Sequence, residues 1–335
     1  METLKSVARS YIVRRIGLAL LVMWAAFTIV FIILYLVPGD PARLIAGGDG
    51  GMTATPDQLA EINRQYGFDQ PIFVQYLRAL GGVLTGNLGT SYQMKQPVTT
   101  ILAAEFGSTF ALAMFALAVA VIIGFIVGSA TVFTRSRMLS KMLDAIPPLG
   151  ASLPTFWVGL MLMQFFSFGL HWFPSSGDKG FNSLVLPGVT MAIAGAALIA
   201  QVLARSLRTS YAESFVEIAK AKGAGRVRVF SAHALRNALL PTLTVLGIMV
   251  ANLFAYSTVS EMIFSRNGLG LSLDKAVQTK DIPMVEGAVL IIAGVYVVTN
   301  LIIDLIYPLV DPRLKSLKRR SSRVLSSVRE ETVAV

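Results

Sequence analysis

Residues 205–241 read RSLRTSYAESFVEIAKAKGAGRVRVFSAHALRNALLP, a polar and basic stretch between two long apolar segments. Its first half predicts an amphipathic helix, with Phe215, Ile218 and Ala219 on one side at helical spacing. Gly223 predicts the end of that helix, because glycine readily adopts the left-handed conformation of a helix cap. A second helical run over 227–240 leads into the next apolar segment. The pattern alone leaves an ordinary loop, held on anionic headgroups by its basic residues, as an open interpretation.

The rest of the chain indicates an integral membrane protein. Of its 335 residues, 54% are hydrophobic and 14% charged, and the mean hydropathy is +0.66. Six windows without Asp, Glu, Lys or Arg approach or exceed the ~20 residues that a membrane-spanning helix needs. They are Ile16–Gly39, Phe106–Thr134, Ala145–Gly177, Gly180–Ala204, Asn237–Ser260 and Gly287–Ile303. We therefore expect an all-α fold with six transmembrane helices.

The positive charges predict the orientation of these helices. With the N-terminus inside, 21 of the 29 Lys and Arg residues fall in inner segments and 8 in outer segments. This bias predicts that both termini and the 205–236 loop are cytoplasmic. The net charge of +10 then reflects topology and attraction to anionic membrane lipid, and we expect no nucleic-acid partner. The chain has no cysteine, which excludes disulfides and thiolate chemistry.

The organisation along the chain follows from these windows. We expect a cytoplasmic segment over 1–15, a first transmembrane helix over 16–37, an extracytoplasmic helical and turn-rich region over 38–102, a five-helix core over 103–312 with its loop at about 205–241, and a basic cytoplasmic tail over 313–335. Thr55 and Gln58 predict a capping box that starts a short helix. Gly124 and Gly128 predict close helix packing in lipid. Pro147, Pro148 and Pro154 predict a kinked third helix.

Several motifs in this order resemble a known family. E-I-A-K-A-K-G at Glu217–Gly223, followed by H-A-L-R-N-A-L-L-P at His233–Pro241, resembles the EAA loop of ABC importer permeases, most of all the dipeptide, oligopeptide and nickel branch. Glu217, Ala219 and Gly223 match E-x-A-x-x-x-G, while His233 and Arg236 stand as they do in the peptide branch. P-G-D-P, G-N-L-G-T-S and the segment Asn300–Arg313 also recur in that branch. The resemblance runs from about Arg14 to Arg313.

The resemblance implies a type I ABC-importer permease fold, in a complex whose other subunits hydrolyse ATP and deliver the solute. The loop would carry a coupling helix that docks in a groove of an ATPase. The chain would form half of a translocation pathway that works by alternating access. Its implied partners are a homologous second permease, two ATPases and an extracytoplasmic solute-binding protein, in a bacterial inner membrane. Short peptides are the leading substrate class, with nickel, heme, glutathione and other small solutes left open.

The chemistry of this chain predicts no enzyme. No glycine is followed by Lys-Ser or Lys-Thr, so a phosphate loop is absent from the sequence. We expect no catalytic constellation, no metal site around the isolated His171, and no cofactor bound by this chain. ATP and Mg²⁺ are then expected in the partner ATPase subunits.

Polar residues within the predicted helices are candidates for two other roles. Gln164, Asn252, Tyr256 and Ser257 are candidate pathway-lining residues, and interhelical hydrogen bonding is the alternative. Asn300, Asp304 and Tyr307 share one helix face at spacings of four and three. We interpret this face as structural, since Asp304 lies near the cytoplasmic end. A proton or ion site is the alternative.

Two other protein classes stay open at this stage. A secondary transporter driven by an ion gradient would show paired interrupted helices and a charge at mid-membrane. A membrane scaffold would not need an EAA loop. Co-purification of ATPase subunits would favour the importer, and uptake by this chain alone would favour a carrier.

Overall fold

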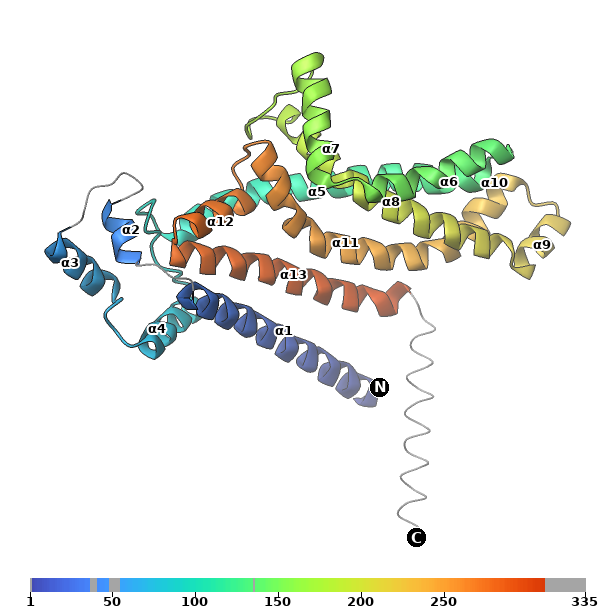
Figure 1. The fold of residues 1–335 in the computed structure, drawn as a ribbon. Helices are drawn as coiled ribbons and strands as arrows, with labels where there is room; N and C mark the ends of the chain where they lie inside the picture. The colour runs from blue at the N-terminus through green and yellow to red at the C-terminus, as the bar shows by residue number, and fades with distance from the viewer. Residues whose placement is uncertain (1, 37–40, 48–54, 135, 311–335) are drawn as a thin grey trace, which may run out of the picture. The chain divides into compact units, whose positions relative to one another are not determined.

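The computed structural model describes residues 2–36, 41–47, 55–134 and 136–310, and these residues are almost entirely helical (Figure 1). The helices are α1 (Glu2–Leu36), α2 (Pro41–Gly47), α3 (Pro56–Tyr66), α4 (Ile72–Leu84), α5 (Val98–Phe133), α6 (Arg137–Ser152), α7 (Thr155–Leu162), η2 (Met163–Gly169), α8 (Asn182–Tyr211), α9 (Ser214–Ala221), α10 (Arg226–Arg228), η3 (Val229–Ala234), α11 (Leu235–Ile263), α12 (Leu269–Gln278) and α13 (Ile282–Val310). Both η elements are π-helical. The expected all-α class is therefore confirmed.

The apolar helices agree with the expected number of spans. Five stretches are long and apolar enough to cross a membrane: Arg14–Leu34, Val98–Phe133, Asn182–Tyr211, Arg226–Val250 and Ile282–Ile302. Met138–Ser152 and Thr155–Gly169 form a bent pair, which makes a sixth if the two halves are one span. The break falls at Leu153 and Pro154, whereas Pro147 and Pro148 lie inside the continuous helix α6. Of the predicted kink positions, the helix is interrupted at Pro154, which lacks the N–H needed to continue it.

The helices begin earlier in the chain than expected. α1 begins at Glu2 rather than near Ile16, and α5 begins at Val98 rather than near Ala103. Charge-free windows mark the part of a helix that suits lipid, and helices continue beyond it into polar surroundings. The P-G-D-P motif at 38–41 lies largely outside the described residues, and the basic tail over 313–335 lies wholly outside them.

The chain divides into two compact units. The first comprises residues 1–120, 152–194 and 252–297, and the second comprises residues 121–151, 195–251 and 298–335. Each has a core of its own. In the first unit, the start of α5 packs against α12 and the start of α13. The buried members of this cluster are Val98, Ile101, Leu102, Leu269, Ala276, Met284, Val285 and Ala288.

Helix α3 forms as its sequence predicts. Thr55 Oγ1 accepts a hydrogen bond from the Gln58 N–H, and the Gln58 side chain accepts one from the Thr55 N–H, which completes the capping box. Gly67 ends the helix at φ 73°. Helix α4 is tied to α1, because Tyr76 Oη accepts from Trp24 Nε1 at 3.0 Å and shares a hydrogen bond with Thr28 Oγ1 at 2.8 Å.

In the second unit, the two predicted small residues of α5 allow close packing against α8. A Cβ added at Gly124 would lie 2.7 Å from Ile199 Cβ, and one added at Gly128 would lie 3.0 Å from the Ala200 carbonyl oxygen. Neither distance accommodates a larger residue without movement. The prediction of close packing is therefore confirmed at both positions. The two glycines let α5 pack closely against α8, the helix from which the 205–241 loop continues.

Candidate functional site

The loop folds into a short helix that ends where the sequence predicts. Helix α9 covers Ser214–Ala221. Gly223 then takes φ 82°, in the left-handed region, and its N–H donates to the Lys220 carbonyl at 2.9 Å. The Ala224 N–H donates to the Ala219 carbonyl at 3.0 Å. These bonds use carbonyls that the end of a helix would otherwise leave without partners, so the turn is well defined.

An apolar base supports this helix in the second unit. Val216 of α9 is fully buried. Next to it, α8, η3 and the start of α11 form a cluster whose buried members are Leu203, Leu207, Phe230, Ala234 and Ala238. Phe133 at the end of α5 meets Phe230 edge-on, with ring centroids 4.5 Å apart. Arg226 Nη2 donates to the Phe133 carbonyl at 2.7 Å. The loop is thus packed onto the ends of two long helices.

The opposite face of α9 is open. Glu217, Ile218 and Lys222 are exposed, and Ile218 exposes 56% of its surface although it is apolar. No atom lies within 4 Å of a Cβ built at Gly223. The sequence grouped Ile218 with the apolar side, but Val216 is the buried residue of α9. α9 therefore presents an apolar side chain beside a carboxylate and an ammonium group on a surface that its own unit leaves uncovered.

The remaining loop candidates lie on the second helical run. His233 is half-buried in η3, and its ring centroid lies 6.4 Å from that of Phe215 in α9. Ala219 is also half-buried. Arg236 is exposed on the first turn of α11. The fold therefore brings α9 and His233 together through Phe215, whereas Arg236 lies exposed at the start of the next helix, α11.

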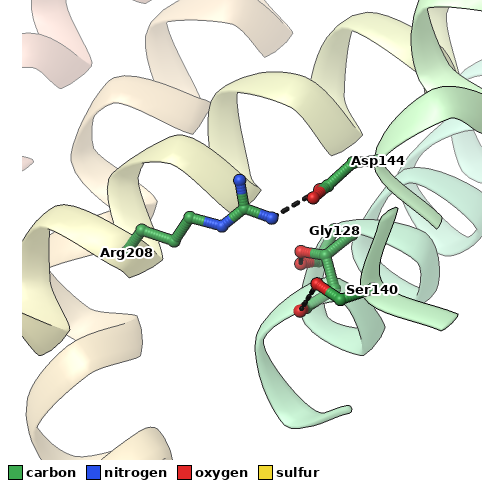
Figure 2. A network of polar contacts seen from close by, with 5 residues as sticks. Gly128, Ser140, Asp144 and Arg208 are labelled. Atoms are coloured by element: carbon green, nitrogen blue, oxygen red, sulfur yellow. Dashed lines mark hydrogen bonds and ion pairs between the residues drawn. The ribbon is translucent and has the colours of Figure 1, made fainter. Parts of the chain in front are cut away.

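An ion pair and a hydrogen bond connect the neighbouring helices of this unit (Figure 2). Arg208 Nη2 on α8 donates to Asp144 Oδ1 on α6, with the two side chains 50% and 37% exposed. Ser140 Oγ of α6 donates to the Thr131 carbonyl of α5 at 3.3 Å. Figure 2 shows the Arg208 side chain extending from α8 toward Asp144. These contacts link the ends of α5, α6 and α8 beside the base of the loop.

The candidate pathway residues occupy different surroundings in the first unit. Gln164 is exposed on η2. On α11, Asn252 is half-buried and Tyr256 is 53% exposed, whereas Ser257 is fully buried and donates to the Phe254 carbonyl at 2.8 Å. Within the described part of the chain, no hydrogen bond joins Gln164 to the α11 residues. The fold places three of the four on one helix and the fourth elsewhere.

The third candidate group lies on α13. Asn300 is half-buried, and Asp304 and Tyr307 follow on the same helix. The side chains of Asp304 and Tyr307 lie outside the described residues, so their shared face stays a prediction from the sequence.

A buried carboxylate that was not among the candidate site residues lies near the end of α11. Glu261 is fully buried. Its Oε1 accepts from Thr109 Oγ1 at 2.7 Å, and its Oε2 accepts from the N–H groups of Gly270 and Leu271 at 2.8 and 3.2 Å. Thr109 Oγ1 in turn accepts from the Leu269 N–H at 2.9 Å. One side chain thereby holds the start of α12 against α5 and α11. The available signal was a single acidic residue at the end of an apolar helix, just before Gly-Leu-Gly.

Arg266 closes the same hairpin from the other side. Its Nη1 donates to Ser183 Oγ at 3.1 Å. Burial lowers the pKa of the Arg266 guanidinium, while the nearby carboxylates of Asp178 and Glu261 act to raise it. The polar contacts of Glu261 and Arg266 therefore connect the hairpin between α11 and α13 to α5 and to the start of α8.

Comparisons with known proteins agree with this architecture. The family described as "Binding-protein-dependent transport system inner membrane component" matches residues 120–316, and its N-terminal family matches residues 8–113. The chain is 33% identical over 310 residues to the glutathione transport system permease protein GsiC of Salmonella paratyphi A, covering 91% of this chain and 99% of the relative. It is 33% identical over 312 residues to a putative peptide transport system permease protein of Brucella abortus, covering 91% and 98%.

A solved structure shares the fold at lower sequence identity. An inward-facing form of the MetNI methionine ABC transporter aligns with a TM-score of 0.54 at 20% identity, covering 63% of this chain and 96% of that chain. The family matches and the relatives covered over almost their full length show the family, and the helix order agrees with them. The chain belongs to the family of binding-protein-dependent transport system inner membrane components, and it is the permease of an ABC importer.

Proposed function

We propose that this permease forms one half of a translocation pathway for short peptides or a related small solute. The proposal is supported by the relatives, which are described as glutathione and peptide transport permeases and match almost their full length. The second half would come from a homologous permease. An extracytoplasmic solute-binding protein would deliver the solute, and specificity would lie largely in that partner.

The observation that carries the mechanism is the open face of α9 on a packed base. Ile218 is exposed, while Val216, two residues earlier and on the opposite face, is fully buried. An exposed apolar side chain on a short amphipathic helix suits insertion into a groove of another protein. We assign α9 as the coupling helix, with Glu217, Ala219 and Gly223 shaping it and His233 and Arg236 following on the supporting helix.

The order of the elements along the chain connects α9 closely to the ends of α8 and α11, so a movement of α9 is passed to both helices. α8 ends at Tyr211, three residues before α9 begins. After the turn, α10, η3 and α11 follow one another without a gap. Lys220 Nζ lies 6.0 Å from the Tyr211 ring centroid, which ties α9 to the end of α8. When two ATPase subunits close on ATP and Mg²⁺, α9 moves with its groove and carries the ends of both helices between two rigid-body states.

The orientation belongs to the same proposal. Both termini and α9 face the cytoplasm of a bacterium, where ATP is available, and the 38–102 region faces outward, where the binding protein docks. Anionic lipid at the inner surface attracts the basic segments. Hydrolysis takes place in the partner subunits, and this chain binds no cofactor.

A pair of glycine substitutions tests the coupling role. Gly223→Val places a β-branched residue at φ 82°, which L-residues rarely adopt, and deforms the turn after α9. We expect normal assembly, but at least a tenfold loss of solute-stimulated ATP hydrolysis and uptake in proteoliposomes. Gly225→Val is the matched control, since Gly225 has φ −66° and no atom near its built Cβ. Full transport by an assembled Gly223→Val complex would contradict the proposal.

A further inference from the structure

The first unit contains a cavity of about 280 Å³ at the outer ends of its helices. Its wall is formed by α1, α4, the chain segments that follow α3 and α4, and the first turns of α13. The residues used below are Phe31, Tyr66, Phe68, Arg78, Tyr92 and Glu286. None of them belongs to the coupling loop, and the proposed transport cycle assigns none of them a role.

A carboxylate without a partner lies in this wall. Glu286, on the second turn of α13, is 8% exposed, so more than nine-tenths of its surface is buried. Its Oε1 is buried and has no hydrogen-bond partner among the described residues. This contrasts with Glu261, whose two oxygens accept three hydrogen bonds. Burying an unpaired carboxylate is unfavourable, and a cation that donates to it removes that penalty.

Aromatic rings form another part of the wall. Tyr66 and Tyr92 meet edge-on with centroids 4.9 Å apart, and Phe68 lies 5.6 Å from Tyr92 and 5.8 Å from Tyr66. The negative face of an aromatic ring attracts a cation, as the Lys95 ammonium 5.7 Å from the Tyr66 ring centroid shows. A carboxylate and aromatic rings around one cavity together suit an ammonium group.

The cavity also has a positive group. Arg78 of α4 lies in the wall, and its Nη1 is only 2.7 Å from the position of a Cβ built at Gly67. Glycine at 67 thus leaves room for this guanidinium as well as adopting φ 73°. A planar guanidinium pairs well with a carboxylate or a phosphate. The wall therefore carries both charges that a zwitterion requires.

We propose that this cavity binds the head of a small zwitterion, with its primary ammonium donating to Glu286 Oε1 and its anionic group facing Arg78. Two sources offer this chemistry: a free amino compound such as a peptide, and the ethanolamine headgroup of a phospholipid. Lipid has access because α1 and α13, which supply Phe31 and Glu286, include membrane-spanning stretches. The inference does not depend on the coupling role of α9.

Two binding measurements on the full-length chain separate the sources. In the first, the chain in nanodiscs of phosphatidylcholine and phosphatidylglycerol is titrated with dialanine and with N-acetyl-dialanine, which lacks the ammonium. In the second, native mass spectrometry measures retention of phosphatidylethanolamine against phosphatidylcholine from mixed nanodiscs. We expect at least a tenfold preference for the ammonium compound in one of the two. The measurement that shows it identifies the source.

Three variants connect that preference to the cavity. Glu286→Gln keeps the side-chain shape and removes the charge, and Ala79→Leu fills the cavity while leaving the carboxylate. Both are expected to weaken binding at least tenfold with an unchanged or higher unfolding temperature. Glu61→Gln, at an exposed carboxylate of α3, is the control and should bind normally. Equal binding of acetylated and free dialanine without lipid preference, or unchanged binding by Glu286→Gln, overturns the proposal. Either result leaves the coupling role of α9 open to its own test, the solute-stimulated ATP hydrolysis of the Gly223→Val complex.

Discussion

Two glycine turns of this permease use glycine for opposite reasons. At the end of α9, Gly223 is needed for its torsion, since φ is 82° and no atom lies near a built Cβ. At the start of α12, space is the constraint. Gly268 has an extended φ of −169°, but a Cβ there would lie 2.4 Å from Glu261 Oε1. A Cβ at Gly270 would lie 2.3 Å from Thr258 Cα.

The difference separates an exposed turn from a buried and closely packed one. The α9 turn leaves its outer face uncovered, so substitutions there should affect assembly and coupling more than folding. The α11–α12 hairpin encloses Glu261 with three donors, so substitutions there should affect folding first. Four further measurements test this contrast.

The largest expected effect is that of Gly270→Val. The clash involves backbone at Thr258, which cannot rotate away as a side chain would, and overpacking of this kind costs about 3 kcal/mol. We expect a marked fall in the unfolding temperature of the purified chain, followed by tryptophan fluorescence in detergent. Gly225→Val, at an uncrowded glycine, should leave that temperature within error. Equal stability of the two variants would remove the distinction between the turns.

Glu261→Gln should have the next largest effect. The amide oxygen can still accept from the Gly270 and Leu271 N–H groups, but the NH₂ then faces the Thr109 hydroxyl, which has to stop donating to residue 261 and reorient, at a cost of about 2 kcal/mol. Chemical denaturation measures the difference in the free energy of unfolding. Glu217→Gln, at the exposed carboxylate of α9, should change that free energy by less than about 0.5 kcal/mol. A stable Glu261→Gln protein would show that the hairpin does not depend on the charge.

Ile218→Asp should separate binding from folding. The side chain is 56% exposed, so the free energy of unfolding should stay within about 0.5 kcal/mol. Co-purification of the ATPase subunits should fall about tenfold, because a charge replaces an apolar contact in the groove. Val227→Asp, at a 71% exposed valine outside α9, provides the comparison. Full retention of the ATPases by Ile218→Asp would argue against α9 as the docking element.

Arg208→Ala should have the smallest effect. The Arg208–Asp144 pair is 50% and 37% exposed, and ion pairs in such positions contribute less than about 1 kcal/mol. A double-mutant cycle with Asp144→Asn isolates the interaction energy of the pair. This energy should decrease with added salt, because salt screens the two charges. A coupling energy well above 1 kcal/mol would indicate that this contact stabilises the base of the loop more than its exposure suggests.

Local features of the fold were predictable from sequence because neighbouring residues determine them. Charge-free windows located the spanning stretches, and the Thr55–Gln58 box and the Gly223 turn formed as expected. The close contacts at Gly124 and Gly128 followed from residue size. Helix ends were less predictable, as at Glu2 of α1, since helices extend past the apolar window into polar surroundings.

The parts of the site that depend on long-range contacts were not predictable. Glu261 is satisfied by Thr109, 152 residues away along the chain, and nothing in either local sequence indicates the pairing. The choice of Val216 over Ile218 as the anchor of α9 depends on where η3 packs. Whether the candidates Gln164 and Tyr256 line a pathway stays a prediction, because a pathway shared with the proposed second permease would depend on that partner's surface as well.

The π-helical segment Val229–Ala234 has a consequence for how this chain can change. A π-turn holds about one residue more than an α-turn, and each α-helical residue advances by roughly 100° around the axis. Losing a single residue here would straighten the segment into ordinary helix and rotate everything before it relative to α11. Insertions and deletions in these six positions should therefore be selected against even where any one side chain is replaceable. The length of the segment, more than its composition, sets the direction in which α9 faces relative to α11.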